Sequence, residues 1–276
     1  MQRTTPKIIY GTAWKQERTT ALVVSAVLQG FRAIDTACQP KHYREDLVGD
    51  ALQLLRENHG INREDLFLQT KFTSISGQDV NKPLPYNPDD PITKQVETSF
   101  QKSLSNLRTT YLDSYILHSP LRTVEHTLEA WRVLMALQDA GKVHKIGVSN
   151  TYDVSILRAL ARERQVQVVQ NRWYEGNEWD RQVLSYCREH EIQYQSFWTL
   201  SGSPMLLTHP SLVELAKAVR CTPAQAVFRL AQMEGVTPLS GTKDETHMRE
   251  DLEVEGITFP SERQKEIDSV KNLVLG

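Results

Sequence analysis

The feature that most constrains the fold is a regular succession of short apolar segments, each followed by a stretch with helical spacing of apolar residues. The apolar segments are rich in Ile, Val, Phe and Tyr, as strands are, and several of the helical stretches end at a glycine. The eight strand segments begin at residues 7, 31, 65, 112, 143, 166, 192 and 235. The helical stretches that follow them cover residues 19–29, 46–58, 92–107, 124–140, 154–164 and 179–190, two segments from 210 and 223, and 244–252.

Eight strand–helix units within 276 residues predict an α/β protein with a (β/α)8 TIM barrel, because repeated units of this kind build a parallel sheet and eight of them close it. We expect one domain over residues 1–276. The rival architecture is an open, doubly wound sheet. The sequence argues against it, because no G-x-G-x-x-G segment follows the first strand and no G-x-x-x-x-G-K-[ST] segment occurs.

The charge balance and the apolar pattern argue against several classes of function. With 32 basic and 34 acidic residues the net charge is −2, so neither nucleic acid nor an anionic membrane is expected as a partner. The longest stretch without a charged residue, 192–213, contains two prolines and a glycine and does not predict a membrane span. The first residues lack the apolar run of a secretory signal. Three cysteines without metal spacing predict free thiols, so we expect a cytoplasmic protein that binds no metal.

Three ionisable side chains stand at the ends of consecutive predicted strands, where a barrel interior otherwise holds branched apolar residues. Asp35, Lys71 and His118 end the second, third and fourth strands, and Tyr43 follows in the loop after the second. Each alone has a plain structural explanation: a turn cap, a solvated lysine or a hydrogen-bonded core histidine. Because the carboxyl ends of neighbouring strands meet at one end of a barrel, we expect the four side chains to form one site.

The chemistry of these four groups indicates proton donation to a carbonyl oxygen. A tyrosine phenol has an ordinary pKa of about 10, and a nearby ammonium group lowers it. A carboxylate keeps that ammonium charged and in place, and a neutral imidazole orients a carbonyl oxygen by hydrogen bonding. Such a site needs no nucleophile and no metal, but it needs a source of hydride, which indicates a nicotinamide cofactor.

Four motifs together resemble the aldo-keto reductase superfamily. They are IDTA and HY within 34–43, INREDLFLQTKF at 61–72, YLDSYILHSP at 111–120 and KIGVSN at 145–150. The resemblance extends from Gly11 to Leu252, with the motifs in family order and at barrel spacing. It implies a (β/α)8 barrel that binds NADPH in an extended form without a Rossmann motif and reduces an aldehyde or ketone to an alcohol.

The four catalytic residues of the superfamily fall on matching residue types in this chain. The resemblance implies that Tyr43 is the proton donor and that Lys71 lowers the pKa of Tyr43. It also implies that Asp35 pairs with Lys71 and that His118 orients the carbonyl group of the substrate.

The same resemblance implies a set of cofactor and substrate contacts. Ser149, Asn150 and Gln170 would hold the nicotinamide carboxamide, and Phe197, with Trp198 as the alternative, would stack on the nicotinamide ring. The other expected cofactor contacts are Gly11, Thr12, Asp35, Leu200, Thr242, Lys243, His247, Glu250 and Asp251. Substrate contacts are expected from Trp14, His42, His118 and Trp173, from the Leu121 region and from the irregular loop 74–91. Such an aromatic lining suits a small carbonyl compound with an apolar body.

The chain departs from the family pattern after the eighth strand. The family has a Lys-Ser pair, then an Arg, then Glu-Asn, around the adenosine 2′-phosphate and the adenine. The same positions here hold Gly241-Thr242, His247 and Glu250-Asp251. Both usual cations are therefore absent, although Lys243 and Arg249 lie close by in the sequence. We expect NADPH as the cofactor, with NADH as the alternative because of Gly241 and His247.

Two other functions fit the same residues. The chain could be a cofactor-binding regulatory subunit of the same fold, although a pure binder needs no proton donor. It could also be a lyase that uses Lys71 as a Schiff-base nucleophile, although a paired Asp35 would favour the charged, unreactive form of the amine. Members of the superfamily are commonly monomers, and we expect a monomer.

Overall fold

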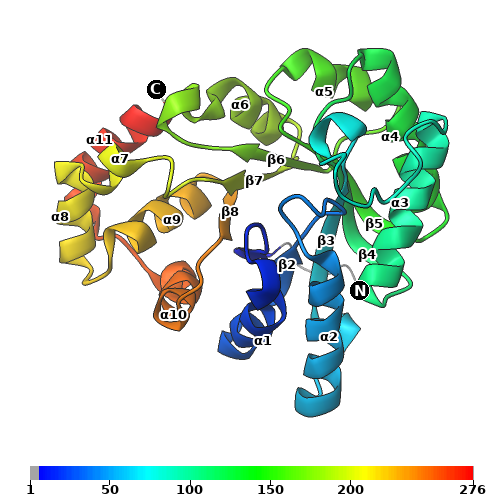
Figure 1. The fold of residues 1–276 in the computed structure, drawn as a ribbon. Helices are drawn as coiled ribbons and strands as arrows, with labels where there is room; N and C mark the ends of the chain where they lie inside the picture. The colour runs from blue at the N-terminus through cyan, green and yellow to red at the C-terminus, as the bar shows by residue number, and fades with distance from the viewer. Residues whose placement is uncertain (1–5, 276) are drawn as a thin grey trace.

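The computed structural model describes residues 6–275 and confirms the predicted barrel. Its eight strands are parallel, pair in chain order, and close by pairing of the last strand with the first. Figure 1 shows the strands at the centre with the helices around them. The strands are β1 (Ile9–Gly11), β2 (Ala33–Asp35), β3 (Phe67–Phe72), β4 (Leu112–Leu117), β5 (Val143–Ser149), β6 (Val168–Arg172), β7 (Gln193–Phe197) and β8 (Val236–Ser240).

A helix is present at each predicted helical stretch, and the helices cover the outer face of the barrel. They are α1 (Thr19–Gln29), α2 (Glu45–His59), α3 (Ile92–Leu107), α4 (Val124–Asp139), α5 (Val154–Ala161), α6 (Arg181–Glu189), α7 (Pro204–Leu207), α8 (Pro210–Ala218), α9 (Pro223–Met233), α10 (Glu245–Glu253) and α11 (Gln264–Leu275). The C-terminal α11 packs against α8.

The helix expected at 179–190 begins later than the sequence predicts. A 3-10 segment, Glu175–Asp180, precedes it. Within that segment Glu178 and Trp179 have φ values of +52° and +59°, in a left-handed region that a right-handed helix does not use. Because the apolar spacing of the sequence continues through this segment, the spacing does not show that α6 begins at Arg181.

The irregular loop 74–91 is anchored to the end of β3. Tyr86 is buried, donates a hydrogen bond from Oη to the carbonyl oxygen of Thr73 (2.7 Å), and packs its ring against Phe72 at 5.6 Å. Gln39, from the loop after β2, donates to the carbonyl oxygen of Gly77 (2.7 Å). The loop is thus attached at the carboxyl-terminal end of the barrel, where barrel enzymes carry their active sites.

The main apolar core lies between the strands and the helices, whereas much of the barrel interior is polar. We expected branched apolar side chains inside, but Gln69, Gln170 and Gln195 occupy inward positions and are fully or almost fully buried. A small apolar cluster of Ile9, Ala33 and Phe67 forms a separate part of the interior. The expectation was wrong because it came from barrels in general, and this interior surrounds a buried charge instead.

Two further expectations concern cysteines and membranes. Cys38, Cys187 and Cys221 are all free thiols. Among residues 6–275, no helix combines the length and the apolar character needed to cross a bilayer.

Candidate active site

A buried ion pair lies where β2 and β3 end. Lys71 is completely buried, and its Nζ donates to Oδ2 of Asp35 (2.6 Å) and to the carbonyl oxygen of Thr36 (2.9 Å). The two residues come together because Asp35 ends β2 and Lys71 lies one residue from the end of β3. Burial is the larger influence on Lys71 and lowers its pKa, while the charge of Asp35 opposes the shift.

Tyr43 and His118 lie next to this pair. Tyr43 is half-buried in the loop between β2 and α2, and Nζ of Lys71 lies 5.2 Å from the centre of its ring. His118, directly after β4, meets the Tyr43 ring edge-on with the ring centres 5.8 Å apart. The structure therefore brings together all four side chains that the sequence singled out.

Burial controls the protonation of Tyr43 and His118. It raises the pKa of Tyr43, and the charge of Asp35 raises it further. We expected Lys71 to lower this pKa; burial and the charge of Asp35 are the larger influences, so the net shift of the Tyr43 pKa is upward. Burial also holds the pKa of His118 well below its ordinary value, and the charge of Lys71 acts in the same direction. Both side chains are therefore neutral at neutral pH, the phenol keeping its proton.

Hydrogen bonds fix the orientation of His118 and Asp35. Nδ1 of His118 lies 2.6 Å from Oγ1 of Thr73. Oδ1 of Asp35 accepts from Nε2 of Gln69 (2.8 Å) and from Nε2 of Gln170 (3.0 Å). Gln195 accepts from both of these amides, at 2.7 and 2.9 Å. Gln69 and Gln195 were not predicted; their only signal was a polar residue at an inward position of a strand.

The three residues expected to hold a carboxamide lie beside this network. Oγ of Ser149 donates to the carbonyl oxygen of Gln170 (2.7 Å), and Nδ2 of Asn150 donates to the carbonyl oxygen of His118 (2.8 Å). Both hydrogens of the Gln170 amide are used by Asp35 and Gln195. Gln170 therefore has only its side-chain oxygen left to offer to a ligand.

Other expected cofactor contacts stand at the ends of β1 and β7. Gly11 pairs in register with Asp35, and Thr12 donates through its amide and its hydroxyl to the Asp35 carbonyl oxygen. Phe197 ends β7 half-buried, whereas the next residue, Trp198, is exposed with φ of +65°. Leu200 follows and packs on the apolar core. Phe197 is thus the aromatic side chain that continues the inner face of the strand.

The segment after β8 holds one buried residue among those expected to contact the cofactor. Asp251 is buried and accepts a hydrogen bond from Oγ of Ser240 (2.6 Å), and burial raises its pKa to about 6. Its carboxylate is thus engaged by β8, and its expected contact with the cofactor stays a prediction. The remaining expected residues are at least partly accessible: Thr242, Lys243, His247 and Glu250.

Lys15 is a cation beside the segment after β8, and the sequence did not single it out. It is buried, and its Nζ donates to the carbonyl oxygen of Gly241 (2.6 Å). No ion pair joins it to an acidic residue within 6–275. Burial lowers its pKa to about 8, and the charges of Lys243 and Arg18 lower it in the same direction. Because 226 positions separate Lys15 from Gly241, no local motif could have indicated the contact.

Two of the residues expected to line a substrate site, Trp14 and Trp173, differ in whether they are accessible. Trp14 is 59% exposed, and its ring contacts that of His42 in a tilted arrangement with the ring centres 3.8 Å apart. Trp173 is only 2% exposed and packs edge-on against Trp179 on the outer side of the barrel. The expectation for Trp173 was therefore wrong: it follows Arg172, the last residue of β6, and turns into the apolar core.

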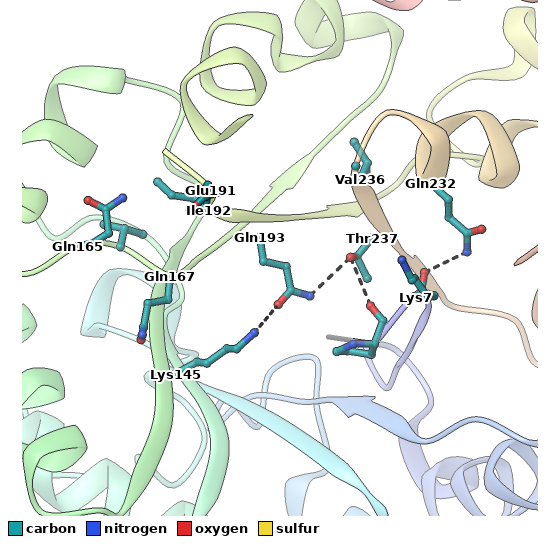
Figure 2. A pocket seen from close by; sticks show the side chains of 13 residues that line it. Lys7, Lys145, Gln165, Gln167, Glu191, Ile192, Gln193, Gln232, Val236 and Thr237 are labelled. Atoms are coloured by element: carbon teal, nitrogen blue, oxygen red, sulfur yellow. Dashed lines mark hydrogen bonds between the residues drawn. The ribbon is translucent and has the colours of Figure 1, made fainter. Parts of the chain in front are cut away.

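A cavity of about 420 Å³ lies at the opposite, amino-terminal end of the barrel. Figure 2 shows Lys145, Gln193 and Thr237 along it, with Nζ of Lys145 3.4 Å from Oε1 of Gln193. These residues stand at or near the beginnings of their strands. None of the four predicted catalytic side chains lines this cavity, so it is separate from the candidate site.

Comparison with known proteins identifies the class. The sequence profile of the Aldo/keto reductase family matches residues 7–272, and the chain therefore belongs to that family. The methylglyoxal reductase DkgA of Salmonella typhimurium is 32% identical over 220 residues, which are 78% of this chain and 72% of that protein. The uncharacterized oxidoreductase YtbE of Bacillus subtilis is 28% identical over 92% of this chain and 84% of its own length. The chain is accordingly an NAD(P)H-dependent oxidoreductase, as expected from its sequence.

Solved structures agree on the fold. The crystal structure of an aldo/keto reductase from Brucella melitensis matches with a TM-score of 0.79 at 25% identity, covering 97% of this chain and 95% of that one. A Bombyx mori aldo-keto reductase solved in complex with NADP matches with a TM-score of 0.79 at 20% identity, over 98% of this chain and 90% of that one.

Proposed function

We propose that this protein reduces an aldehyde or a ketone to an alcohol, with Tyr43 as the general acid. The observation that carries the proposal is the group of four side chains at one end of the barrel. Asp35 and Lys71 form a buried pair at 2.6 Å, and the rings of Tyr43 and His118 stand next to it. The group contains a proton donor and a neutral hydrogen-bonding imidazole, but no activated nucleophile.

Tyr43 is suited to give a proton to a carbonyl oxygen that becomes an alkoxide. Its raised pKa keeps the phenol protonated at neutral pH, so the proton is present when the substrate arrives. The phenolate left after transfer lies near the ammonium of Lys71, which stabilises the new negative charge. Asp35 keeps Lys71 in that position, and neutral His118 donates a hydrogen bond to the carbonyl oxygen and orients it.

The hydride comes from a reduced nicotinamide when that cofactor is bound. The residues at hand fit such a group. Phe197 offers a half-buried ring at the end of β7, and Ser149, Asn150 and Gln170 offer polar groups on or directly after β5 and β6. Gly11 has no side chain to obstruct a ring at the end of β1. We propose that these residues hold the nicotinamide and its carboxamide.

Lys15 favours NADPH over NADH. Its ammonium lies 2.6 Å from the carbonyl oxygen of Gly241, the position where the family has a lysine for the 2′-phosphate. Lys243 and Arg18 lie near enough to influence its pKa. A cluster of cations in which Lys15 has no acidic partner among residues 6–275 suits a phosphate group, so we propose that Lys15 replaces the missing family lysine.

The lyase alternative has less support. Lys71 is completely buried and donates to both Asp35 and the carbonyl oxygen of Thr36. A Schiff base would require the amine to break both hydrogen bonds and to become accessible. Burial does lower the pKa of Lys71, but a neutral amine that no substrate can reach does not act as a nucleophile.

Replacement of Tyr43 tests the proposal. Tyr43→Phe is expected to lower kcat/KM for aldehydes by about 100-fold or more, the usual contribution of a general acid, while the Kd for NADPH stays within about threefold. Tyr111→Phe is the matched control, because Tyr111 stacks under Arg63 beside the beginning of β4. Turnover would be followed by loss of dihydronicotinamide absorbance and NADPH binding by tryptophan fluorescence. Near-normal turnover in Tyr43→Phe would remove Tyr43 from the acid role. Tight NADPH binding without turnover of any aldehyde in the unchanged protein would favour the regulatory-subunit alternative.

A further inference from the structure

Arg172 points toward the candidate active site. It is the last residue of β6, and side chains along a strand alternate between the two faces. Gln170 faces inward, where it contacts Asp35, and Asn171 faces outward, where it donates to Asp180. Arg172 therefore returns to the inner face, about 6–7 Å beyond Gln170 toward the carboxyl-terminal end of the barrel.

Aromatic rings hold the Arg172 guanidinium at that position. Its central carbon lies 5.4 Å from the ring centre of Phe197 and 5.0 Å from that of Trp198. Tyr174 packs edge-on against Trp198 at 5.5 Å and extends the aromatic wall. The strand end itself is fixed, because the Arg172 amide donates to Oη of Tyr152 (3.1 Å). The rings therefore hold the Arg172 guanidinium in a defined position without neutralising its charge.

Within residues 6–275, no acidic side chain forms an ion pair with Arg172, and its Nε is buried without a hydrogen-bond partner. The neighbouring carboxylates are already engaged. Asp180 accepts from Asn171 and from Tyr194 on the outer side of the strand, at 2.7 and 2.8 Å. Asp35 accepts from Lys71 and from two glutamine amides. The Arg172 side chain has a polar contact with the Tyr152 hydroxyl, but a partly buried guanidinium without a negatively charged partner is costly unless an anion completes it.

We propose that Arg172 binds a carboxylate of the substrate, so that the preferred substrates are aldehydes or ketones that also carry a carboxylate group. The inference rests on the proposed function, because it places the reacting carbonyl between Tyr43 and the ring that stacks on Phe197. The planar guanidinium matches the two oxygens of a carboxylate. The cations suited to the cofactor phosphates, Lys15 and Lys243, lie at the β8 end of the site, whereas Arg172 lies beside Phe197. An anion at Arg172 is therefore the substrate's.

The test compares two aldehydes that differ by one carboxylate. The unchanged protein with NADPH is expected to reduce 4-carboxybenzaldehyde with a kcat/KM at least about tenfold above that for benzaldehyde. Arg172→Gln is expected to lower kcat/KM for the carboxylated aldehyde by about 10- to 100-fold, mainly through KM. Its effect on benzaldehyde should stay within about threefold, and Arg172→Lys should restore part of the preference. Arg158→Gln is the control, since Arg158 also lies over an aromatic ring, that of Tyr186, but on α5.

Two binding measurements separate the possible failures. Calorimetric titration with benzoate is expected to show binding that Arg172→Gln weakens about tenfold or more, while benzyl alcohol binds both proteins alike. The Kd for NADPH should be the same in both. The proposal would be overturned if Arg172→Gln lowered kcat/KM equally for the two aldehydes. It would also be overturned if the variant bound NADPH more weakly and kept the same aldehyde preference, because Arg172 would then contact the cofactor. Absence of any reduction, together with benzoate binding that depends on Arg172, would instead refute the proposed function and leave the anion site standing.

Discussion

Replacement of Asp35 by Asn tests how the buried charge of Lys71 is held. The substitution keeps the size of the side chain but removes its negative charge and places an amide or a carbonyl opposite the Lys71 ammonium, which is completely buried. Breaking a buried ion pair by removing one partner costs about 3–5 kcal/mol. The cost has an upper limit, because Lys71 can instead lose its proton. At pH 7 that costs about 4–5 kcal/mol for a lysine of ordinary pKa, at about 1.4 kcal/mol per pKa unit.

An unpaired Lys71 ammonium and a deprotonated Lys71 have similar costs, so Asp35→Asn is expected to lower the free energy of unfolding by about 3–5 kcal/mol at pH 7. The loss should shrink between about pH 7 and about pH 9, because the folded variant releases the Lys71 proton there while the unfolded chain still holds it. Removing the charge as well, in the double variant Asp35→Asn with Lys71→Met, should recover about 2 kcal/mol or more.

Urea unfolding followed by circular dichroism at several pH values measures these free energies. Asp139→Asn is the control: Asp139 pairs with Arg164 at 2.8 Å, but its side chain is 64% exposed, so a loss below about 1 kcal/mol is expected. A loss of similar size in Asp35→Asn would refute the reasoning. So would a double variant that is less stable than Asp35→Asn, because the buried charge would then not be the source of the cost.

Three other predictions give independent tests, two of them with a paired second substitution. Lys15→Met should weaken NADPH binding by about tenfold or more and NADH binding far less. In the unchanged protein, the affinity for NADPH should fall as the pH rises through the Lys15 pKa of about 8. The reason is that the neutral amine no longer attracts a phosphate. Both effects are measured by fluorescence titration. Gly147→Ala should lower the free energy of unfolding by about 3 kcal/mol, because its Cβ would lie 2.2 Å from a carbonyl oxygen of β6. Gly256→Ala, with open space around it, should cost less than about 1 kcal/mol in the same urea assay. Trp173→Phe should lower the free energy of unfolding by about 1–3 kcal/mol and leave KM for aldehydes unchanged, whereas Trp14→Ala should raise KM with little loss of stability.

The barrel and its four central side chains could be predicted because both follow from order along the chain. Alternating strand and helix patterns specify a parallel barrel, and in a parallel barrel every strand carries its last residues to the same end. Asp35, Lys71 and His118 each stand at or near such an end, so their convergence follows from topology and needs no side-chain detail.

The errors come from contacts that the order of the chain does not encode. A shift of one residue along a strand changes the face on which a side chain lies, and the sequence pattern assigned Trp173 to the wrong face. Trp173 was expected in the site and lies in the core, whereas Arg172, for which no role was expected, lies beside Phe197. Lys15 meets Gly241 across 226 positions, a contact that only the closure of β8 against β1 creates.

The polar interior explains how the barrel keeps a lysine and a carboxylate buried together. Had the partners of Asp35 been additional cations, they would have competed with Lys71 and further disfavoured its charged form. Gln69 and Gln170 instead donate neutral amide hydrogens, which stabilise the carboxylate without adding charge. The pair of Asp35 and Lys71 therefore remains neutral overall, and the next inward position of β6 after Gln170 holds a cation. That cation is Arg172, so the proposed carboxylate would meet a positive charge beside proton-transfer groups that are neutral as a set.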